Sequence, residues 1–139
     1  MSKASQKDWP TIRVLIAGKK RGPEARAWVK VRRHYFAVEK LALKPVLATT
    51  ADEAIDLLQR ESFDLVFLDK VIQSSEAERI AEACAKQNDP PVLVLDFPHD
   101  VLMSPLEKLG LDVEVGKTRL VQSVQRRLDR LAAREQASS

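Results

Sequence analysis

The sequence predicts an α/β domain in which five strands of a parallel sheet alternate with five helices. The strands read as short, continuous apolar runs, which is typical of strands buried on both faces of a sheet. Segments with helical spacing of their apolar residues separate these runs. A chain of 139 residues suits one domain with a core of its own. We therefore expect a doubly wound sheet covered by helices on both faces, with right-handed crossovers.

The first predicted strand and helix come early in the chain. Residues 12–17 form an apolar run that ends in Gly18. Pro23 suits the first turn of a helix, and residues 24–43 contain neither glycine nor proline. We therefore predict a long first helix over residues 24–43. Apolar residues recur along this helix at Trp28, Val31, Tyr35, Val38 and Ala42.

A second strand, helix and third strand follow. Residues 45–48 read as a short strand. Thr50 can cap the next helix, and Glu53, three residues later, completes the sequence pattern of a capping box. We expect this helix to end near Ser62 and residues 63–69 to form the third strand.

The second half of the chain continues the alternation. Pro90-Pro91 ends one helical pattern, and Gly110 suits the C-terminal cap of another. The expected elements are a helix over residues 75–87, a strand over 92–95, a helix over 101–109, a strand over 112–115 and a helix over 118–134. We expect the domain to span residues 11–134, with flexible segments over residues 1–10 and 135–139.

The composition points to an ordinary globular protein. The formal net charge is +3, and 31% of the residues are charged. No apolar stretch is long enough to span a bilayer, and the N-terminus lacks the apolar core of a secretory signal. The single cysteine, Cys84, cannot form an internal disulfide, which fits a cytoplasmic protein. Basic residues gather late in the chain and are read as a solvated helix face: Arg126, Arg127, Arg130 and Arg134.

Several segments together resemble the receiver domain of bacterial response regulators. Residues 51–58 lead into Phe-Asp-Leu-Val-Phe-Leu-Asp at residues 63–69, like the helix and strand that precede a phospho-accepting aspartate. Residues 91–96 resemble the fourth strand, and residues 110–117 resemble the segment that presents an essential lysine. The resemblance covers about residues 12–131. It implies a flavodoxin-like fold with the strand order 2-1-3-4-5.

The resemblance also implies a site, which survives only in part. In an active receiver, two carboxylates after the first strand and the acceptor aspartate hold Mg²⁺, which offsets the charge of the incoming phosphoryl group. Asp69 matches the acceptor and Lys117 matches the lysine. Gly18 and Lys19 stand where the acidic pair is expected, and Asp96 stands where a hydroxyl residue is expected.

These departures argue against ordinary phosphoryl chemistry. A lysine about 6 Å from Mg²⁺ would repel it by roughly 5 kcal/mol at an effective dielectric of 20. We therefore expect no metal, no cofactor and no enzymatic activity. We expect Asp69, Asp96 and Lys117 to form an ionic cluster, joined by Lys19 unless that lysine points to solvent. A plainer role for Asp69 is to accept backbone amides or to pair with Lys117 alone.

The leading functional hypothesis is a phosphorylation-independent pseudo-receiver that acts as a protein-interaction or dimerisation module in bacterial signal transduction. Receivers generally use the surface of helix 4, strand 5 and helix 5 for such contacts. The expected partners are a histidine kinase, an output protein or a second copy of the chain. The basic final helix favours an acidic partner or Arg–Asp pairs across a twofold axis. The corresponding residues are Lys108, Glu114, Arg119, Gln122, Arg126, Asp129 and Arg130.

Two alternatives stay open at this point. The chain could be an atypical receiver that is still phosphorylated on Asp69. It could also bind nucleic acid or a phosphorylated ligand through the basic loop at residues 18–22 and the first helix. That loop matches neither of the common glycine-rich phosphate motifs. We therefore do not expect nucleic acid as the partner, and we expect no membrane insertion.

Overall fold

The computed structural model of the chain describes residues 9–18, 30, 33–34, 36–68, 73–95, 106–111, 113–115 and 120–138. The named elements are β1 (Thr11–Ala17), β2 (Ala42–Ala48), α2 (Ala51–Arg60), β3 (Leu65–Leu68), α3 (Ser74–Ala85), β4 (Val92–Leu95), β5 (Val113–Val115) and α5 (Leu120–Ser138). Among these described residues, no helix is long and apolar enough to cross a membrane.

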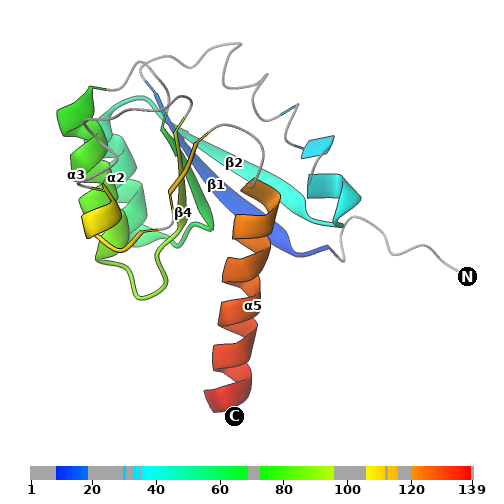
Figure 1. Ribbon diagram of the computed structural model, residues 1–139. Helices are drawn as coiled ribbons and strands as arrows, with labels where there is room; N and C mark the ends of the chain where they lie inside the picture. Colours follow the sequence, from blue (N-terminus) through cyan, green and yellow to red (C-terminus); the bar gives the residue numbers. More distant parts are fainter. Residues whose placement is uncertain are drawn as a thin grey trace, which may run out of the picture.

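The strands form a parallel sheet with the order β2-β1-β3-β4-β5 (Figure 1). The predicted parallel sheet and its order from β2 to β4 are confirmed, and β5 joins β4 along three residues. Helices α2 and α3 lie on one side of the sheet and α5 lies on the other. This is the two-faced covering that continuous apolar strands require.

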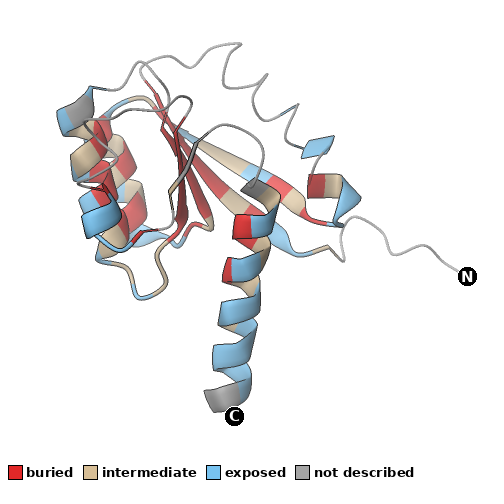
Figure 2. Cartoon of the chain, viewed as in Figure 1, coloured by how far each residue is buried: buried red, intermediate tan, exposed pale blue. Residues whose placement is uncertain are grey.

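Alternate residues of β1 enter two separate cores. Leu15 and Ala17 pack in the cluster that includes α2 and α3. Ile12, Val14 and Ile16 pack in the cluster that includes Val124 of α5. Because successive side chains of a strand point to opposite faces, both sets are removed from water. Figure 2 accordingly shows the central strands coloured as buried, with further buried positions on α2, α3 and α5.

The first predicted helix ends earlier than expected. Its described residues reach Val38, and β2 begins at Ala42 instead of at residue 45. The N–H of Leu41 donates to the carbonyl of Phe36 and the N–H of Lys40 donates to that of Ala37, which together form a Schellman motif. Lys40 has a φ of 57°, in the left-handed region. The chain therefore leaves the helix at Lys40 without a glycine.

This helix end also corrects the predicted apolar stripe. Val38 is 78% exposed, whereas Phe36 is 0% exposed and belongs to the core on the α5 side of the sheet. Ala42 lies in β2, while Trp28, Val31 and Tyr35 lie outside the described residues. Phe36 and Leu41 share one core cluster, the hydrophobic contact that often accompanies a Schellman end.

The start of α2 follows the predicted capping pattern with one change. The Thr50 hydroxyl accepts a hydrogen bond from the N–H of Glu53 at 3.0 Å. The Glu53 carboxylate turns to Thr49, accepting from its hydroxyl at 3.1 Å and its N–H at 3.5 Å, instead of returning to Thr50. The cap therefore joins α2 to the end of β2.

Helix α5 runs through Ser138, four residues beyond the predicted end at 134. No glycine or proline interrupts it, and residues such as Ala133, Glu135 and Gln136 are good or neutral helix formers. The tail predicted to be flexible over residues 135–139 is thus helical up to Ser138. The C-terminal half of α5 projects beyond the sheet (Figure 1).

Two other local predictions are confirmed. Gly110 has a φ of 76°, and its N–H donates to the carbonyl of Glu107, as expected for a C-terminal cap. Cys84 is fully buried on α3, and burial raises the pKa of its thiol to about 12. The remaining boundaries that the structure describes lie within two residues of their predicted positions.

Candidate functional site

The strands of the sheet end level with one another at its carboxyl edge. Ala17 of β1 lies opposite Leu68 of β3, and Leu68 lies opposite Leu95 of β4. Leu95 in turn lies opposite Val115 of β5. In an open parallel sheet this edge is where ligand sites form. The predicted pocket residues follow these four strand ends in the sequence, so the pocket stays a prediction for this edge of the sheet.

Gly18 is the predicted pocket residue that the structure describes. It is buried directly after β1, and its N–H donates to the carbonyl of Ala48 at 3.0 Å. Asp69, Asp96, Lys117 and Lys19 lie outside the described residues, so the ionic cluster stays a prediction. By chain connectivity, Asp69 follows Leu68 and Asp96 follows Leu95. These two aspartates therefore follow neighbouring strands of the sheet, β3 and β4.

The predicted interaction face lies largely on α5. Gln122, Arg126, Asp129 and Arg130 are all exposed there. Their spacing places them on neighbouring positions of the helix surface. Arg126 also donates from Nη2 to the Ser123 hydroxyl at 3.1 Å.

The remaining members of that face are only partly described. Lys108 is exposed just before the Gly110 turn. Glu114 belongs to β5, but its side chain is not among those described, and Arg119 lies outside the described residues. The structure therefore describes the α5 part of this face and Lys108, and the role of the face in contacts stays a prediction.

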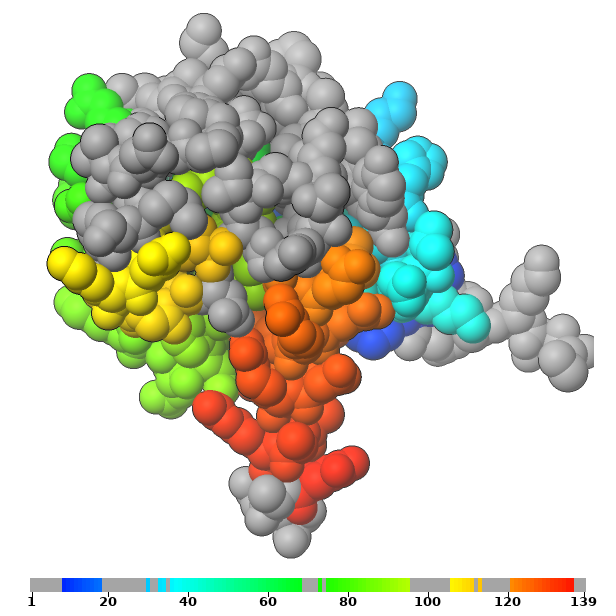
Figure 3. Space-filling view, viewed as in Figure 1, coloured from blue at the N-terminus to red at the C-terminus, as the bar shows by residue number. Residues whose placement is uncertain are grey.

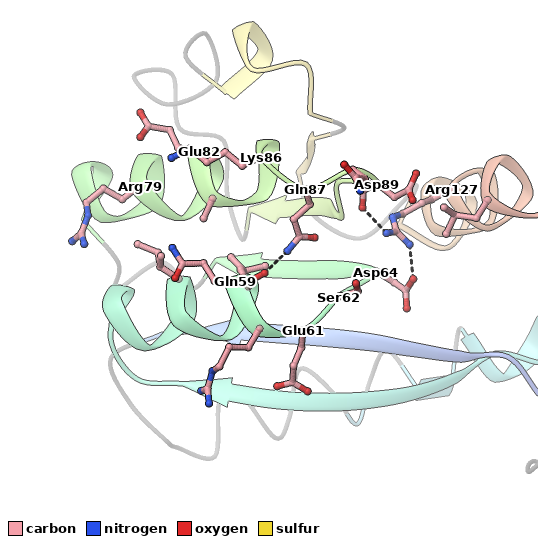
Figure 4. A pocket seen from close by; sticks show the side chains of 16 residues that line it. Gln59, Glu61, Ser62, Asp64, Arg79, Glu82, Lys86, Gln87, Asp89 and Arg127 are labelled. Carbon is pink, nitrogen blue, oxygen red and sulfur yellow. Dashed lines mark hydrogen bonds and ion pairs between the residues drawn. The ribbon is translucent and has the colours of Figure 1, made fainter. Parts of the chain in front are cut away.

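Arg127 forms a buried cluster that the sequence interpretation missed. Its side chain is only 6% exposed, and its Nη1 lies 2.5 Å from Oδ1 of Asp64, whose side chain is 17% exposed. Nε donates to the Pro90 carbonyl at 2.9 Å and Nη2 donates to the Asp89 carbonyl at 2.7 Å. Figure 4 shows Arg127 reaching from α5 toward Asp64 and Asp89. The late basic run is therefore not entirely a solvated face.

Asp64 connects this cluster to the start of the sheet. Its Oδ2 accepts the backbone N–H of Arg13 at 2.9 Å. The Arg13 guanidinium lies 2.6 Å from the Glu61 carboxylate and 4.9 Å from the centre of the Phe63 ring. Because each charge has an opposite charge or a carbonyl beside it, burial of the Arg127 guanidinium is compensated. This arrangement holds α5 against β1, β3 and the segment before β4.

An open groove of about 810 Å³ lies beside this cluster, between the ends of α2 and α3 and the side of α5 (Figure 4). The Gln87 side chain lines this groove and donates a hydrogen bond from Nε2 to the Leu58 carbonyl of α2 at 2.7 Å. Arg79 pairs with Asp52 across α3 and α2 at 2.5 Å. The groove lies at the amino edge of the sheet, opposite the predicted pocket. The hydrogen bonds and ion pairs of its described residues are structural, and none of them joins a nucleophile to a base.

One sequence signal could have identified Arg127. It lies three residues after Val124 and one residue before Leu128, so it occupies the apolar stripe of α5. An arginine within such a stripe faces the core and needs a carboxylate there. The sequence does not show which carboxylate, because Asp64 is 63 positions away.

Comparison with known proteins gives matches in structure only. No protein-family model and no curated protein matches the chain. A signal receiver domain from Vibrio parahaemolyticus is 18% identical with a TM-score of 0.64, over 93% of this chain and 98% of that one. A response regulator receiver domain protein from Methanospirillum hungatei is 18% identical with a TM-score of 0.62, over 89% and 98%.

A third structural relative is a pilus assembly protein, CpaE, from Caulobacter crescentus. It is 15% identical with a TM-score of 0.55, over 84% of this chain and 92% of that one. At these identities the matches establish the fold. The chain therefore resembles response-regulator receiver domains, and the resemblance extends over most of its length.

Proposed function

We propose that the chain is a pseudo-receiver of bacterial signal transduction, without enzymatic activity, that works by protein contact and independently of phosphorylation. One observation carries the proposal. β1 ends level with β3, and the residues that follow β1 are Gly18 and Lys19, where Mg²⁺ would need carboxylates. Neither residue can supply an anionic oxygen ligand, and Lys19 brings a positive charge where the resemblance implies a negative one.

The Arg127 cluster supports the same proposal from the opposite edge of the sheet. It attaches α5 to Asp64, Asp89 and Pro90 through contacts of 2.5 to 2.9 Å. These groups all precede β3 or β4, whereas the predicted pocket follows the strands. The position of α5 is thus stabilised by contacts that do not involve Asp69.

The structural relatives are consistent with a contact role. One of them is named as a pilus assembly protein instead of a response regulator. The same fold therefore occurs in proteins named for assembly as well as in proteins named for signalling.

The direct test is a titration with beryllofluoride and Mg²⁺, followed by amide spectra. We expect no saturable change at Gly18, Leu68 or Leu95 in the natural chain at millimolar Mg²⁺. A matched variant, Gly18→Asp with Lys19→Asp, restores the acidic pair and should gain a response. Asp69→Asn in that background should remove the response again.

The opposite outcome identifies the alternative function. If the natural chain responds to beryllofluoride and Asp69→Asn abolishes the response, the protein is an atypical receiver phosphorylated on Asp69. Mass spectrometry after incubation with acetyl phosphate would then find an added phosphoryl group.

A homodimer is a second form of this contact function, favoured by opposite charges on one exposed face. Arg126 and Asp129 are both exposed on α5 and three positions apart. A twofold axis can therefore place Arg126 of each copy beside Asp129 of the other copy. Light scattering coupled to size exclusion would detect the dimer. Arg126→Glu with Arg130→Glu should shift it toward monomer, and unchanged association would remove this face from the dimer.

A further inference from the structure

A line of arginines runs along the exposed surface of α5. Arg126, Arg130 and Arg134 are all exposed and follow one another at four-residue spacing. At 1.5 Å per residue they span about 12 Å along the helix axis. We call these three residues the arginine ridge.

One acidic residue of α5, Asp129, lies beside the first arginine of the ridge, about 60° around the helix from Arg126. With 3.6 residues per turn, Asp129 lies about 100° and Glu135 about 140° around the helix from Arg130. The ridge therefore carries three positive charges, and the carboxylate of Asp129 lies near one end of it. Its last residue, Arg134, pairs with Asp89 of the segment before β4.

A recess adjoins the ridge. It has a volume of about 270 Å³ and is lined by Arg130 and Arg134 together with Leu131, Pro90 and Gly110. Arg127 and Asp89 complete its lining, so three arginines and one carboxylate surround a partly apolar space. The lower half of α5 stands clear of the body of the protein in the space-filling view, which leaves room for a partner chain (Figure 3).

We propose that the arginine ridge and this recess bind an acidic helical segment of a partner protein. Carboxylates at four-residue spacing on a helix repeat every 6 Å or so, which matches the ridge. The planar guanidinium group of arginine pairs with a carboxylate through two parallel hydrogen bonds. An apolar side chain of the same segment fits the recess against Leu131 and Pro90.

Charge and size favour an acidic protein over nucleic acid. The ridge offers three cations, whereas DNA-binding proteins with strong salt dependence commonly contact six to ten phosphates. Asp89 and Asp129 lie close to the ridge in sequence or space, and they would repel a continuous phosphate backbone. Carboxylates on a helix can be spaced to avoid them.

This inference rests on the proposed contact function, but its test is separate from the phosphorylation test. The probe is a fluorescein-labelled helical peptide of 14 residues, with glutamate at every fourth position and a leucine after the middle glutamate. Its binding is followed by fluorescence anisotropy at low salt. Asp69→Asn should bind the peptide as the natural chain does, whatever the beryllofluoride titration shows.

Substitutions locate the binding surface. An exposed ion pair is worth about 0.2 to 1 kcal/mol, so Arg126→Ala or Arg130→Ala should weaken binding about 1.4-fold to 5-fold each. The triple alanine variant of the ridge should weaken binding by about 3-fold to 100-fold, the product of the three single effects. Arg79→Ala is the matched control, because Arg79 is an exposed arginine on α3, on the other side of the sheet.

Three results would overturn the proposal. The first is absence of binding to the natural chain, and the second is an equal loss of binding in Arg79→Ala. The third is equal or tighter binding of duplex DNA, or of a peptide of the same composition with its glutamates scattered around the helix. The variant with Arg126→Glu, Arg130→Glu and Arg134→Glu should instead bind the corresponding lysine peptide, and such binding would show that the surface remains folded.

Discussion

Arg127→Met should destabilise the protein strongly, although it lies in a run of basic residues. Methionine keeps much of the apolar stem of arginine, so the change removes mainly the guanidinium contacts. These include the ion pair at 2.5 Å with Asp64 and two hydrogen bonds to the Asp89 and Pro90 carbonyls. Breaking one partner of a buried ion pair costs about 3–5 kcal/mol. Because Asp64 keeps 17% of its side-chain surface exposed, we expect the lower end, about 3 kcal/mol.

Urea denaturation measures this loss, since the free energy of unfolding is obtained from the midpoint and slope. Arg126→Met is the matched control, because Arg126 is the adjacent arginine and is exposed; it should stay within about 0.5 kcal/mol. Replacing Asp64 as well, by leucine, should cost less than the sum of the two single changes. A loss below about 1 kcal/mol for Arg127→Met, with an unchanged slope, would refute the structural role assigned to this arginine.

Three further changes test local features of the fold. Lys40→Gly should raise the free energy of unfolding by about 0.5–1 kcal/mol in urea denaturation, because glycine adopts the φ of 57° without strain; lower stability would contradict the assigned helix end. Thr50→Ala should cost about 1 kcal/mol by removing the cap on the Glu53 N–H, and Thr50→Ser should retain most of the stability. Cys84 should resist iodoacetamide at pH 8 in the folded protein and react in urea, since its pKa is raised to about 12 by burial. The thiol ionises from about pH 9 in the unfolded chain but not in the folded protein. The natural chain should therefore lose free energy of unfolding relative to Cys84→Ala between pH 9 and 12. If the free energy of unfolding of the two proteins changes equally with pH, this linkage is excluded.

The sheet could be predicted because its strands are buried on both faces. Val92–Leu95 is an uninterrupted apolar run bounded by Pro91, and its predicted and observed limits coincide. The Gly110 cap could be predicted because glycine is the usual residue at a left-handed helix end. In each case the information lies within a few neighbouring residues.

The end of the first helix could not be predicted in the same way. Lys40 is an ordinary helix former, and no local signal separates it from the helix before it. The left-handed turn at Lys40 is stabilised by hydrogen bonds to the Phe36 and Ala37 carbonyls and by burial of Leu41 beside Phe36. That burial exists only once the sheet is present.

The sequence by itself determined the alternation of strands and helices, the parallel sheet, and the presence of Gly18-Lys19 directly after the first strand. Those properties follow from local periodicity and from residue chemistry at strand ends. Only the tertiary structure decided that Arg127 faces the interior, while Arg126, Arg130 and Arg134 stay exposed along α5. The physical reason is distance along the chain: Arg127 is stabilised by groups 37 to 63 positions away, which only folding brings within hydrogen-bonding reach.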